Sequence, residues 1–315
     1  MKAVVTGIAG FVGSHLGERL LDSGAEVTGL DCFTDYYARS IKEANLTGLR
    51  SHPRFSFVET SIQDADWRRL LDGTTHLFHL AAQAGVRRSW GTDFSVYTAN
   101  NVEATQVLLE ACVGSSIARL VYASSSSVYG DAVQIPMRED ARPQPVSPYG
   151  VTKLAAEHLC HLYWVNYHVP TVALRYFTVY GPRQRPDMAF NRFLRAIQSG
   201  EPITLYGDGE QTRDFTFVGD AVTATVAAAD RGDPGSVYNI GGGSRVSMNH
   251  VLELMAGCTG RTPDVTHEPT QKGDMRDTYA DTSLARDRLG FVPQTDLEDG
   301  IQAEHDWLAL TPVGT

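Results

Sequence analysis

The sequence has few cysteines and no excess of positive charge. Its 315 residues include only Cys32, Cys112, Cys160 and Cys258, which are widely spaced and form no C-x-x-C pair. This spacing fits neither a zinc site nor a disulfide framework, so we expect no metal and a reducing, cytoplasmic environment. The formal net charge of -10 at pH 7 argues against a general nucleic-acid or anionic-membrane surface.

Long apolar runs are also missing. The apolar stretch after Lys2 is interrupted by Gly7 and Gly10, unlike the core of a signal peptide. No segment approaches the roughly 18 uninterrupted apolar residues of a membrane span. With 42% hydrophobic and 20% charged residues, the composition predicts an ordinary soluble globular protein with enough material for a sizeable core and no membrane partner.

Short apolar runs rich in β-branched residues alternate with helical patterns through the first half of the chain. Because continuous apolar strands need cover on both faces, they predict a parallel sheet with crossover helices. The fold class is therefore α/β, a Rossmann-type doubly wound sheet with a smaller C-terminal α/β lobe. The predicted strands cover 3–6, 26–30, 55–58, 76–80, 120–123 and 172–174, and apolar residues at helical spacing predict helices over 102–112 and 153–167.

The pattern loosens after residue 180, where Gly-Pro, Arg-Pro and Tyr-Gly-Asp-Gly turns separate short segments. We therefore expect residues 1–180 to form the dinucleotide-binding domain and residues 181–315 the substrate-binding lobe. Residues 218–229 again have a helical pattern, so we expect residues 215–240 to return to the first domain.

A glycine motif follows the first predicted strand. In "VVTGIAGFVGSHL" the strand leads into Gly7, Gly10 and Gly13 and then into an apolar-periodic helix. The glycines permit a tight turn, a close approach to a pyrophosphate and close helix packing, with the helix N-terminus facing the anion. Asp31 ends the next strand, eighteen residues after Gly13, where a carboxylate accepts both ribose hydroxyls. Since an acid there repels a 2′-phosphate, NAD is favoured over NADP.

Small residues follow the fourth predicted strand. The segment "HLAAQAG" contains Ala81 and Ala82. Their small side chains either let the backbone pass close to the nicotinamide half of a dinucleotide or serve tight sheet packing.

Four serines follow the fifth predicted strand in "YASSSSVYG". A serine run alone is more typical of a linker or turn. However, "SPYGVTKLAAE" places Tyr149 and Lys153 four residues apart, on one face of a helix that Pro148 helps to start. An ammonium beside a phenol favours the phenolate, and oxidised nicotinamide would add a second positive charge. With both in place we expect the pKa of Tyr149 to lie well below its usual value of about 10. Tyr149 is then a candidate general base, and a serine at the strand end is a candidate to hold the same substrate hydroxyl.

Several motifs together give the chain a strong family resemblance. The segments "TGIAGFVG", "SSSSVYG", "YGVTK", "LRYFTVYGP" and "RDFTFVGD" resemble those of the extended short-chain dehydrogenase/reductase family, in particular its NAD-dependent nucleotide-sugar epimerases. The resemblance covers essentially the whole chain. It implies that Ser125, four residues before the tyrosine of V-Y-G, is the catalytic hydroxyl and that Tyr149 and Lys153 form the Y-x-x-x-K pair.

The resemblance also implies binding residues. The expected cofactor contacts are Gly7, Gly10, Phe11, Val12, Gly13, Asp31, Asp64, Ala81, Ala82, Tyr149, Lys153 and Tyr176. The expected substrate contacts are Arg87, Ser125, Ser126, Ser127, Tyr149, Thr178, Arg185, Arg213 and Arg276. Two positions depart from the family pattern: Ser61 stands where relatives often have Asp, and Arg276 where many have Pro.

The residues after Ser125 distinguish the reactions of the family. Its dehydratases carry Asp-Glu there and its uronate decarboxylases Ser-Glu, whereas this chain has Ser126 and Ser127. Hydroxyl groups without a carboxyl group do not shuttle a proton at carbon, so epimerisation is preferred. The segment "RYFTVYGPRQRPDMAF" resembles UDP-glucuronate 4-epimerases, which makes Arg185 the candidate bidentate clamp for the C6 carboxylate.

The sequence therefore predicts NAD-dependent 4-epimerisation of UDP-glucuronic acid to UDP-galacturonic acid. A UDP-glucose 4-epimerase, a UDP-glucuronate decarboxylase and a catalytically silent NAD-binding sensor or scaffold remain open alternatives. Helices 102–112 and 153–167 carry more apolar residues than one buried face requires. We therefore expect a homodimer, as is common among the relatives.

Overall fold

The computed structural model describes residues 1–131 and 134–310, so the last five residues of the predicted second lobe lie outside the described residues. A seven-stranded sheet dominates the first half of the chain, and each adjacent pair of its strands is parallel. Its spatial order is β11-β6-β5-β4-β1-β2-β3, which contains the Rossmann order with the switch point between β1 and β4. The strands are β1 (Lys2–Thr6), β2 (Glu26–Asp31), β3 (Phe55–Glu59), β4 (His76–His79), β5 (Arg119–Ser125), β6 (Thr171–Tyr176) and β11 (Val237–Ile240).

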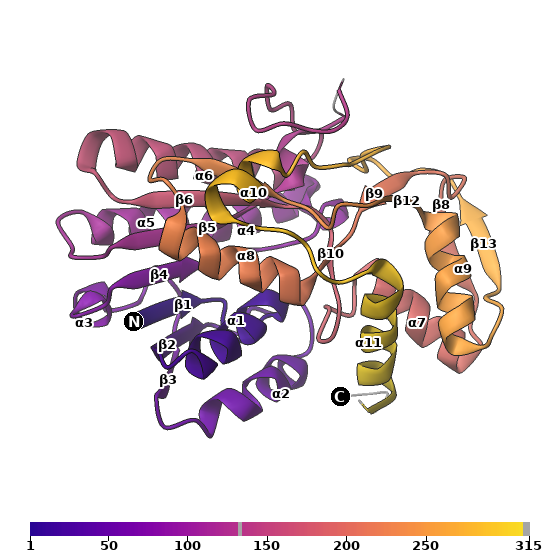
Figure 1. The fold of residues 1–315 in the computed structure, drawn as a ribbon, viewed down its shortest axis with the longest axis horizontal. Helices are drawn as coiled ribbons and strands as arrows, with labels where there is room; N and C mark the ends of the chain where they lie inside the picture. Colours follow the sequence, from indigo (N-terminus) through magenta and orange to yellow (C-terminus); the bar gives the residue numbers. More distant parts are fainter. Residues whose placement is uncertain (132–133, 311–315) are drawn as a thin grey trace.

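Helices cover both faces of this sheet, as its apolar strands require. Alternate residues of β1 show the division, since Ala3 and Val5 pack into one core and Val4 into the other. The first core is covered by α1 (Phe11–Asp22), α2 (Arg39–Arg50), α8 (Val218–Arg231) and α10 (Ser283–Leu289). The second is covered by α3 (Trp67–Leu71), α5 (Ala104–Cys112) and α6 (Pro148–Tyr167). The predicted doubly wound α/β fold is confirmed (Figure 1).

A second lobe has its own apolar core, on the right of Figure 1. It contains α7 (Ala189–Ser199), α9 (Met248–Thr259) and α11 (Leu297–Leu310) together with the short sheets β8–β13 and β9–β12. The strands of these sheets are β8 (Ile203–Tyr206), β9 (Thr212–Asp214), β12 (Arg245–Ser247) and β13 (Val265–Glu268). A further two-stranded sheet pairs β7 (Val179–Tyr180) with β10 (Thr216–Phe217).

The chain passes between the two lobes more than once. Within the predicted returning segment, α8 packs on α1 and β11 adds to the edge of the large sheet. Helix α10 also returns to the first lobe, outside the predicted segment, because Ala285 and Leu289 belong to the core beneath α1 and α8. Successive segments in the second half of the chain therefore belong to one lobe and then to the other.

Local sequence explains where α6 begins. Ser147 has extended backbone geometry and accepts a hydrogen bond from the Gly150 N–H, and Pro148 occupies the start of the helix, where its missing N–H costs nothing. The other predicted helix differs from expectation. The segment Thr98–Glu103 is a π-helix, and α5 follows it from Ala104.

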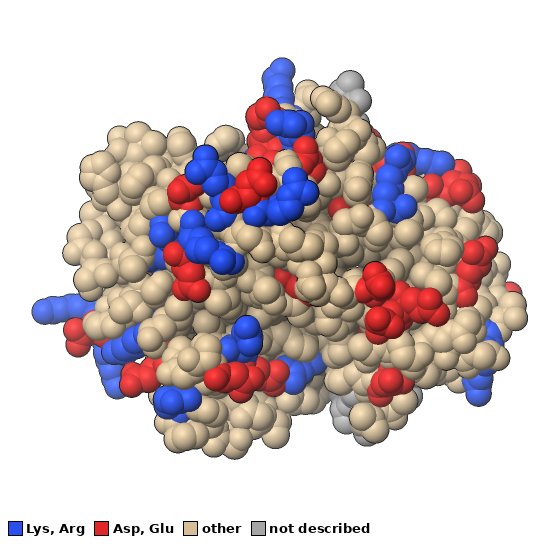
Figure 2. All heavy atoms as spheres, in the orientation of Figure 1, with Lys and Arg blue, Asp and Glu red and all other residues tan. Residues whose placement is uncertain are grey.

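Within the part of the chain that the structure describes, no helix is long and apolar enough to cross a membrane. Figure 2 shows acidic and basic side chains intermixed over one face, with acidic groups gathered around the start of α11. That face has no continuous basic surface, in keeping with the net charge of -10.

Candidate active site

A long cavity lies at the carboxyl ends of the central strands, beside the β1–β4 switch point where dinucleotides bind in this fold. It extends from the turn after β1 to residues of the second lobe. The structure brings most of the predicted site residues to its wall. These are Gly7, Gly10, Phe11, Val12, Gly13, Asp31, Ala81, Ala82, Ser125, Ser126, Ser127, Tyr149, Lys153, Tyr176, Thr178, Arg185 and Arg213.

The turn between β1 and α1 has the shape that its glycines predict. Gly7 has φ +73°, which favours glycine. A Cβ on Gly13 would lie 2.1 Å from the Gly7 carbonyl oxygen, so only glycine lets α1 approach the turn this closely. Gly10 caps α1 without a side-chain hydrogen bond, and no acidic residue lies in its first turn. The helix N-terminus is therefore free to face a pyrophosphate.

Asp31 is held at the end of β2 by backbone donors. Its Oδ1 accepts from the Phe33 N–H at 2.8 Å and its Oδ2 from the Ala9 N–H at 3.2 Å. Burial raises the pKa of Asp31, while the Lys42 ammonium, 3.9 Å from Oδ1, opposes this effect. Each carboxylate oxygen retains acceptor capacity, so the fixed acid fits the paired hydroxyls of an adenosine ribose.

The predicted cofactor residue Asp64 does not line the cavity. Instead it accepts a 2.6 Å hydrogen bond from the Ser61 hydroxyl, and Ser61 itself lies on the wall with Gln63. Asp64 is thus linked to the cavity wall through Ser61, and its direct contact with the cofactor stays a prediction.

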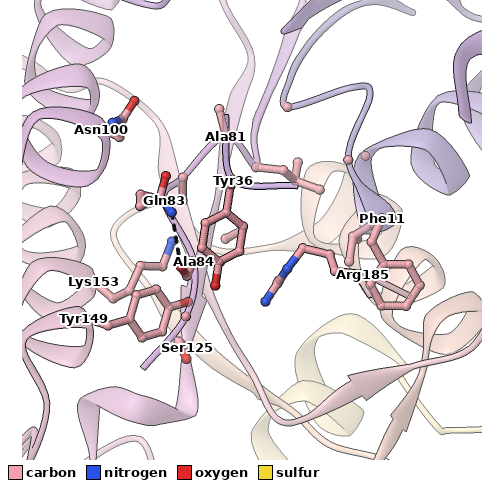
Figure 3. A pocket seen from close by; sticks show the side chains of 18 of the residues that line it. Phe11, Tyr36, Ala81, Gln83, Ala84, Asn100, Ser125, Tyr149, Lys153 and Arg185 are labelled. Carbon is pink, nitrogen blue, oxygen red and sulfur yellow. Dashed lines mark hydrogen bonds between the residues drawn. The ribbon is translucent and has the colours of Figure 1, made fainter. Parts of the chain in front are cut away.

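Ser125 and Tyr149 meet in the cavity from two different elements. Ser125 ends β5, and its Oγ accepts a hydrogen bond from the Ser127 N–H at 3.1 Å. Tyr149 lies in the first turn of α6, and its phenol points toward Ser125 in Figure 3. Burial raises the pKa of Tyr149, while hydrogen bonding with Ser125 and the charge of Arg185 partly oppose the rise. Without oxidised nicotinamide, burial thus outweighs the nearby positive charge, and the lowered Tyr149 pKa expected with the cofactor bound stays a prediction.

Lys153 lies one helical turn beyond Tyr149, deep in the cavity wall. Its ammonium is 4.7 Å from the centre of the Tyr122 ring. Burial lowers the pKa of Lys153 to about 8, with Cys160 and Glu157 opposing the decrease. The cation–π contact helps to keep the buried ammonium charged.

The second lobe contributes a cation on the opposite side of the cavity. Arg185 grips Asp187 through two hydrogen bonds, from Nε at 2.9 Å and from Nη2 at 3.0 Å. In Figure 3 its guanidinium extends toward the Tyr36 hydroxyl and the Tyr149 side of the cavity. Thr178 lines the same region. A polar group of the substrate held here would face both Arg185 and the Ser125–Tyr149 pair.

Of the three other arginines expected to contact the substrate, Arg213 lines the cavity, whereas Arg87 and Arg276 do not. Arg87 instead pairs with Asp274 at 2.7 Å. Arg276 is exposed and pairs with Asp208 at 2.9 Å. Asp274 itself lines the cavity, and the substrate contacts of Arg87 and Arg276 stay predictions.

Several residues of the cavity wall were not predicted from the sequence. Tyr36 and Lys42 come from the segment that follows Asp31, and Gln83 and Asn100 lie near the nicotinamide-side segment. An amphipathic reading places Lys42 on a solvated helix face, yet its side chain is only 6% exposed. Proximity to Asp31 along the chain was the signal available for Tyr36 and Lys42.

The arrangement places a hydroxyl, a phenol and an ammonium at one end of a dinucleotide-shaped cavity. A phenol with a nearby cation can accept a proton from an alcohol, and the serine hydroxyl can hold that alcohol. The glycine turn and Asp31 fit NAD at the other end. The site is thus suited to proton removal coupled to hydride transfer.

Comparisons with known proteins agree with this geometry. The model of the "NAD dependent epimerase/dehydratase family" matches residues 3–241. The crystal structure of UDP-glucuronic acid 4-epimerase from Bacillus cereus in complex with UDP-glucuronic acid and NAD is similar, with a TM-score of 0.96, 43% identity and coverage of 98% of this chain and 99% of that one. A UDP-glucuronate 4-epimerase of Thermodesulfobacterium geofontis (strain OPF15) is 35% identical over 309 residues, 96% of this chain and 95% of the relative. A Bacillus subtilis (strain 168) protein, named an uncharacterized UDP-glucose epimerase, YtcB, is 45% identical over 313 residues, 98% of each chain.

Proposed function

This chain belongs to the NAD dependent epimerase/dehydratase family, and from that premise we propose that it converts UDP-glucuronic acid to UDP-galacturonic acid through a transient 4-keto sugar. The observation that carries the proposal is Arg185, whose charge acts on the Tyr149 phenol in one cavity. In a uronic acid the carboxylate is bonded to C5, next to C4. A carboxylate held by Arg185 would therefore bring the 4-hydroxyl toward Tyr149.

The chemistry divides between the cofactor and the protein. When bound, NAD supplies the acceptor for the C4 hydride and the donor that returns it. Tyr149 takes the proton of the 4-hydroxyl, Ser125 holds that oxygen, and the Lys153 ammonium stabilises the phenolate. Rotation of the keto sugar then presents its other face, and Tyr149 returns the proton to the new hydroxyl.

Ser126 and Ser127 limit what happens to the keto sugar. Both line the cavity beside Ser125, and their hydroxyls do not act as acid or base at carbon near neutral pH. A family dehydratase uses an acidic pair at this place. Its absence favours return of the hydride over elimination.

The same proposal assigns the remaining cavity residues. The large-sheet lobe binds NAD through the glycine turn, Asp31 and the segment after β4, and the second lobe binds the UDP-sugar. Arg213 faces the diphosphate, and Thr178 adds a hydroxyl near the carboxylate. Ser61 and Asp64 contact the adenine side.

We also propose a cytoplasmic homodimer. Exposed apolar side chains gather on α6, where Leu162, Val165 and Tyr167 are all about half exposed. Neighbouring α4 (Phe94–Tyr97) adds Phe94 and Val96. Exposed apolar side chains on neighbouring helices favour a protein partner, and a second copy of the chain supplies the same side chains by two-fold symmetry.

The decisive experiment incubates the purified protein with UDP-glucuronic acid and NAD and identifies the products by NMR. UDP-galacturonic acid is expected. Faster turnover of UDP-glucose would instead support the neutral-sugar epimerase, the activity named for the B. subtilis relative. Carbon dioxide with a UDP-pentose would support the decarboxylase, and binding of NAD without turnover of any UDP-sugar would support the sensor.

Light scattering tests the dimer, which a monomeric mass would refute.

A further inference from the structure

The Arg185 guanidinium is already fixed by a carboxylate of the protein itself. Its Nε and Nη2 atoms donate to the two oxygens of Asp187, at 2.9 Å and 3.0 Å. This is the side-on, two-bond arrangement that holds a guanidinium most rigidly. The two bonds do not use the Nη1 end, which remains available to a ligand in the cavity.

A tyrosine from the other lobe supports this pair. Tyr36, in the segment between β2 and α2, donates its hydroxyl to Asp187 Oδ2 at 3.2 Å. Its ring lies 5.6 Å from the Arg185 guanidinium and 5.0 Å from that of Arg88. Figure 3 shows the Tyr36 hydroxyl directed toward Arg185 across the cavity.

Tyr36 packs closely against the segment after β4. A Cβ built on Gly85 would lie 2.2 Å from the Tyr36 oxygen, so the ring packs against a backbone that only glycine permits. Gly85 has φ +103° and belongs to the segment after β4 that lines the nicotinamide side. Tyr36 thus lies against the same segment that lines the cofactor side of the cavity.

A negative charge beside a carboxylate-binding arginine has a cost. Asp187 neutralises part of the Arg185 charge and repels a uronate carboxylate, so it weakens substrate binding. Affinity for the carboxylate therefore does not explain an acid at this position. Its two hydrogen bonds do, because they control the direction in which the Arg185 guanidinium points.

We propose that Asp187, held by Tyr36, is a positioning residue that fixes the Arg185 guanidinium and thereby keeps the C5–carboxylate bond of the keto sugar out of line with the C4 ketone. The proposal rests on the proposed function, since only a uronate brings a carboxylate to Arg185. It assigns Asp187 to reaction selectivity rather than to affinity.

The competing reaction follows from the chemistry of the intermediate. A 4-keto uronate is a β-keto acid. When the bond between C5 and the carboxyl carbon aligns with the ketone π system, that bond breaks, its electron pair forms the C4–C5 enolate and carbon dioxide leaves. Water then supplies a proton to C5, which gives a UDP-4-ketopentose. Hydride return to C4 with a proton on the oxygen completes a UDP-pentose.

The test measures the ratio of decarboxylated to epimerised product from UDP-glucuronic acid with NAD present. Asp187→Asn keeps the size of the side chain but removes its charge and one acceptor of the Arg185 pair. We expect this ratio to rise at least about tenfold, while KM stays the same or decreases because a repelling charge is gone. Tyr36→Phe keeps the ring and removes only the hydroxyl, so we expect a smaller rise in the same direction.

The chain offers a matched control. Arg138 and Asp140 form another Arg-x-Asp pair, with Nε 3.2 Å from Oδ1, but both side chains are more than half exposed and neither lines the cavity. Asp140→Asn should leave the product ratio and KM unchanged. A general loss of stability would lower all rates without changing the ratio.

The outcomes separate the two proposals. If the wild-type protein does not epimerise UDP-glucuronic acid, the proposed function fails and this inference fails with it. If the wild type epimerises, but Asp187→Asn and Tyr36→Phe both keep its product ratio, only the positioning role is refuted. Should Asp187→Asn not fold, the ratio for Tyr36→Phe alone decides between support and refutation.

Discussion

The Lys153 ammonium lies over the face of Tyr122, 4.7 Å from the ring centre. Tyr122 belongs to β5 and is 1% exposed, and its ring also packs 5.6 Å from that of His79. Burial lowers the pKa of His79 to about 3 and the Lys153 charge opposes its protonation further, so His79 stays neutral. The aromatic face therefore supports Lys153 without a competing cation.

Tyr122→Leu should narrow the pH range in which the enzyme works. The pKa of Lys153 is about 8. Loss of a desolvated cation–π contact of about 2 kcal/mol lowers that pKa by roughly 1.5 units. The alkaline limb of the kcat profile moves toward neutral pH by the same amount. Tyr122→Phe retains the aromatic face and should keep the limb in place. The same alkaline pKa in the kcat profiles of the two variants would contradict the role of the ring.

Tyr149→Phe should abolish proton transfer without removing cofactor binding. The phenol is the group placed to accept the 4-hydroxyl proton, and a general base typically contributes about 10²–10⁴-fold. We expect kcat to decrease by at least this factor. Ser125→Ala should cost less, because it removes only a hydroxyl that holds the substrate. NAD titration of both variants is the control, and unchanged turnover in Tyr149→Phe would overturn the mechanism.

The parts of the site that follow local patterns were predictable from the sequence. The glycine turn, Asp31 and the Tyr149–Lys153 pair each depend on residues close together in the chain, and the strand periods place them at one sheet edge. Parallel strands bring their carboxyl ends together, so the β1, β2 and β5 ends meet without further information.

Contacts between distant segments were not predictable in this way. Arg87 is drawn to Asp274, 187 residues away, and Arg276 to Asp208, 68 residues away. The spacing of residues along the chain does not predict such partners. The raised pKa of Tyr149 has the same origin, because burial by the whole fold decides it rather than the neighbouring turn of the helix.

The buried ion pair of Glu157 and Arg175 was also not predicted from the sequence. Arg175 Nη2 and Nε donate to the two Glu157 oxygens at 2.6 Å and 3.1 Å, and both side chains are about 5% exposed or less. Ser124 donates to Glu157 at 2.7 Å, and Arg175 Nη1 donates to the Tyr129 hydroxyl at 2.8 Å. This network joins α6 to the strand end that carries Ser125.

Arg175→Met should be strongly destabilising. It leaves the Glu157 carboxylate buried without its cation, which typically costs about 3–5 kcal/mol. The exposed pair of Arg39 and Glu59 is also joined by two hydrogen bonds, from Nη1 and Nη2 at 2.7 Å and 2.8 Å, with both side chains about half exposed. Arg39→Met should therefore cost far less stability than Arg175→Met. Denaturant unfolding of both variants measures the contrast, and equal losses would show that burial does not decide the effect.

Glu304 is a second buried acid, placed where α11 meets the strand β7. It is fully buried, and its Oε2 accepts a hydrogen bond from the Gly181 N–H at 2.8 Å. Its Oε1 has no hydrogen-bond partner in the described part of the chain. Burial raises the pKa of Glu304 to about 8, although the Gly181 hydrogen bond opposes the increase.

Glu304 should make the protein less stable as the pH rises. Its folded pKa of about 8 lies above the ordinary value of 4.5, so the protonated acid contributes stability that is fully present below about pH 4.5 and is lost as the pH rises through 8. Glu304→Gln keeps an acceptor for Gly181 and does not ionise. Its free energy of unfolding should exceed that of the wild type by a margin that grows between pH 5 and 8 to a few kcal/mol and then levels off. Glu298→Gln, at an exposed position of α11, should show no such growth. A constant margin for Glu304→Gln across this range would mean that the acid is ionised in the folded protein throughout.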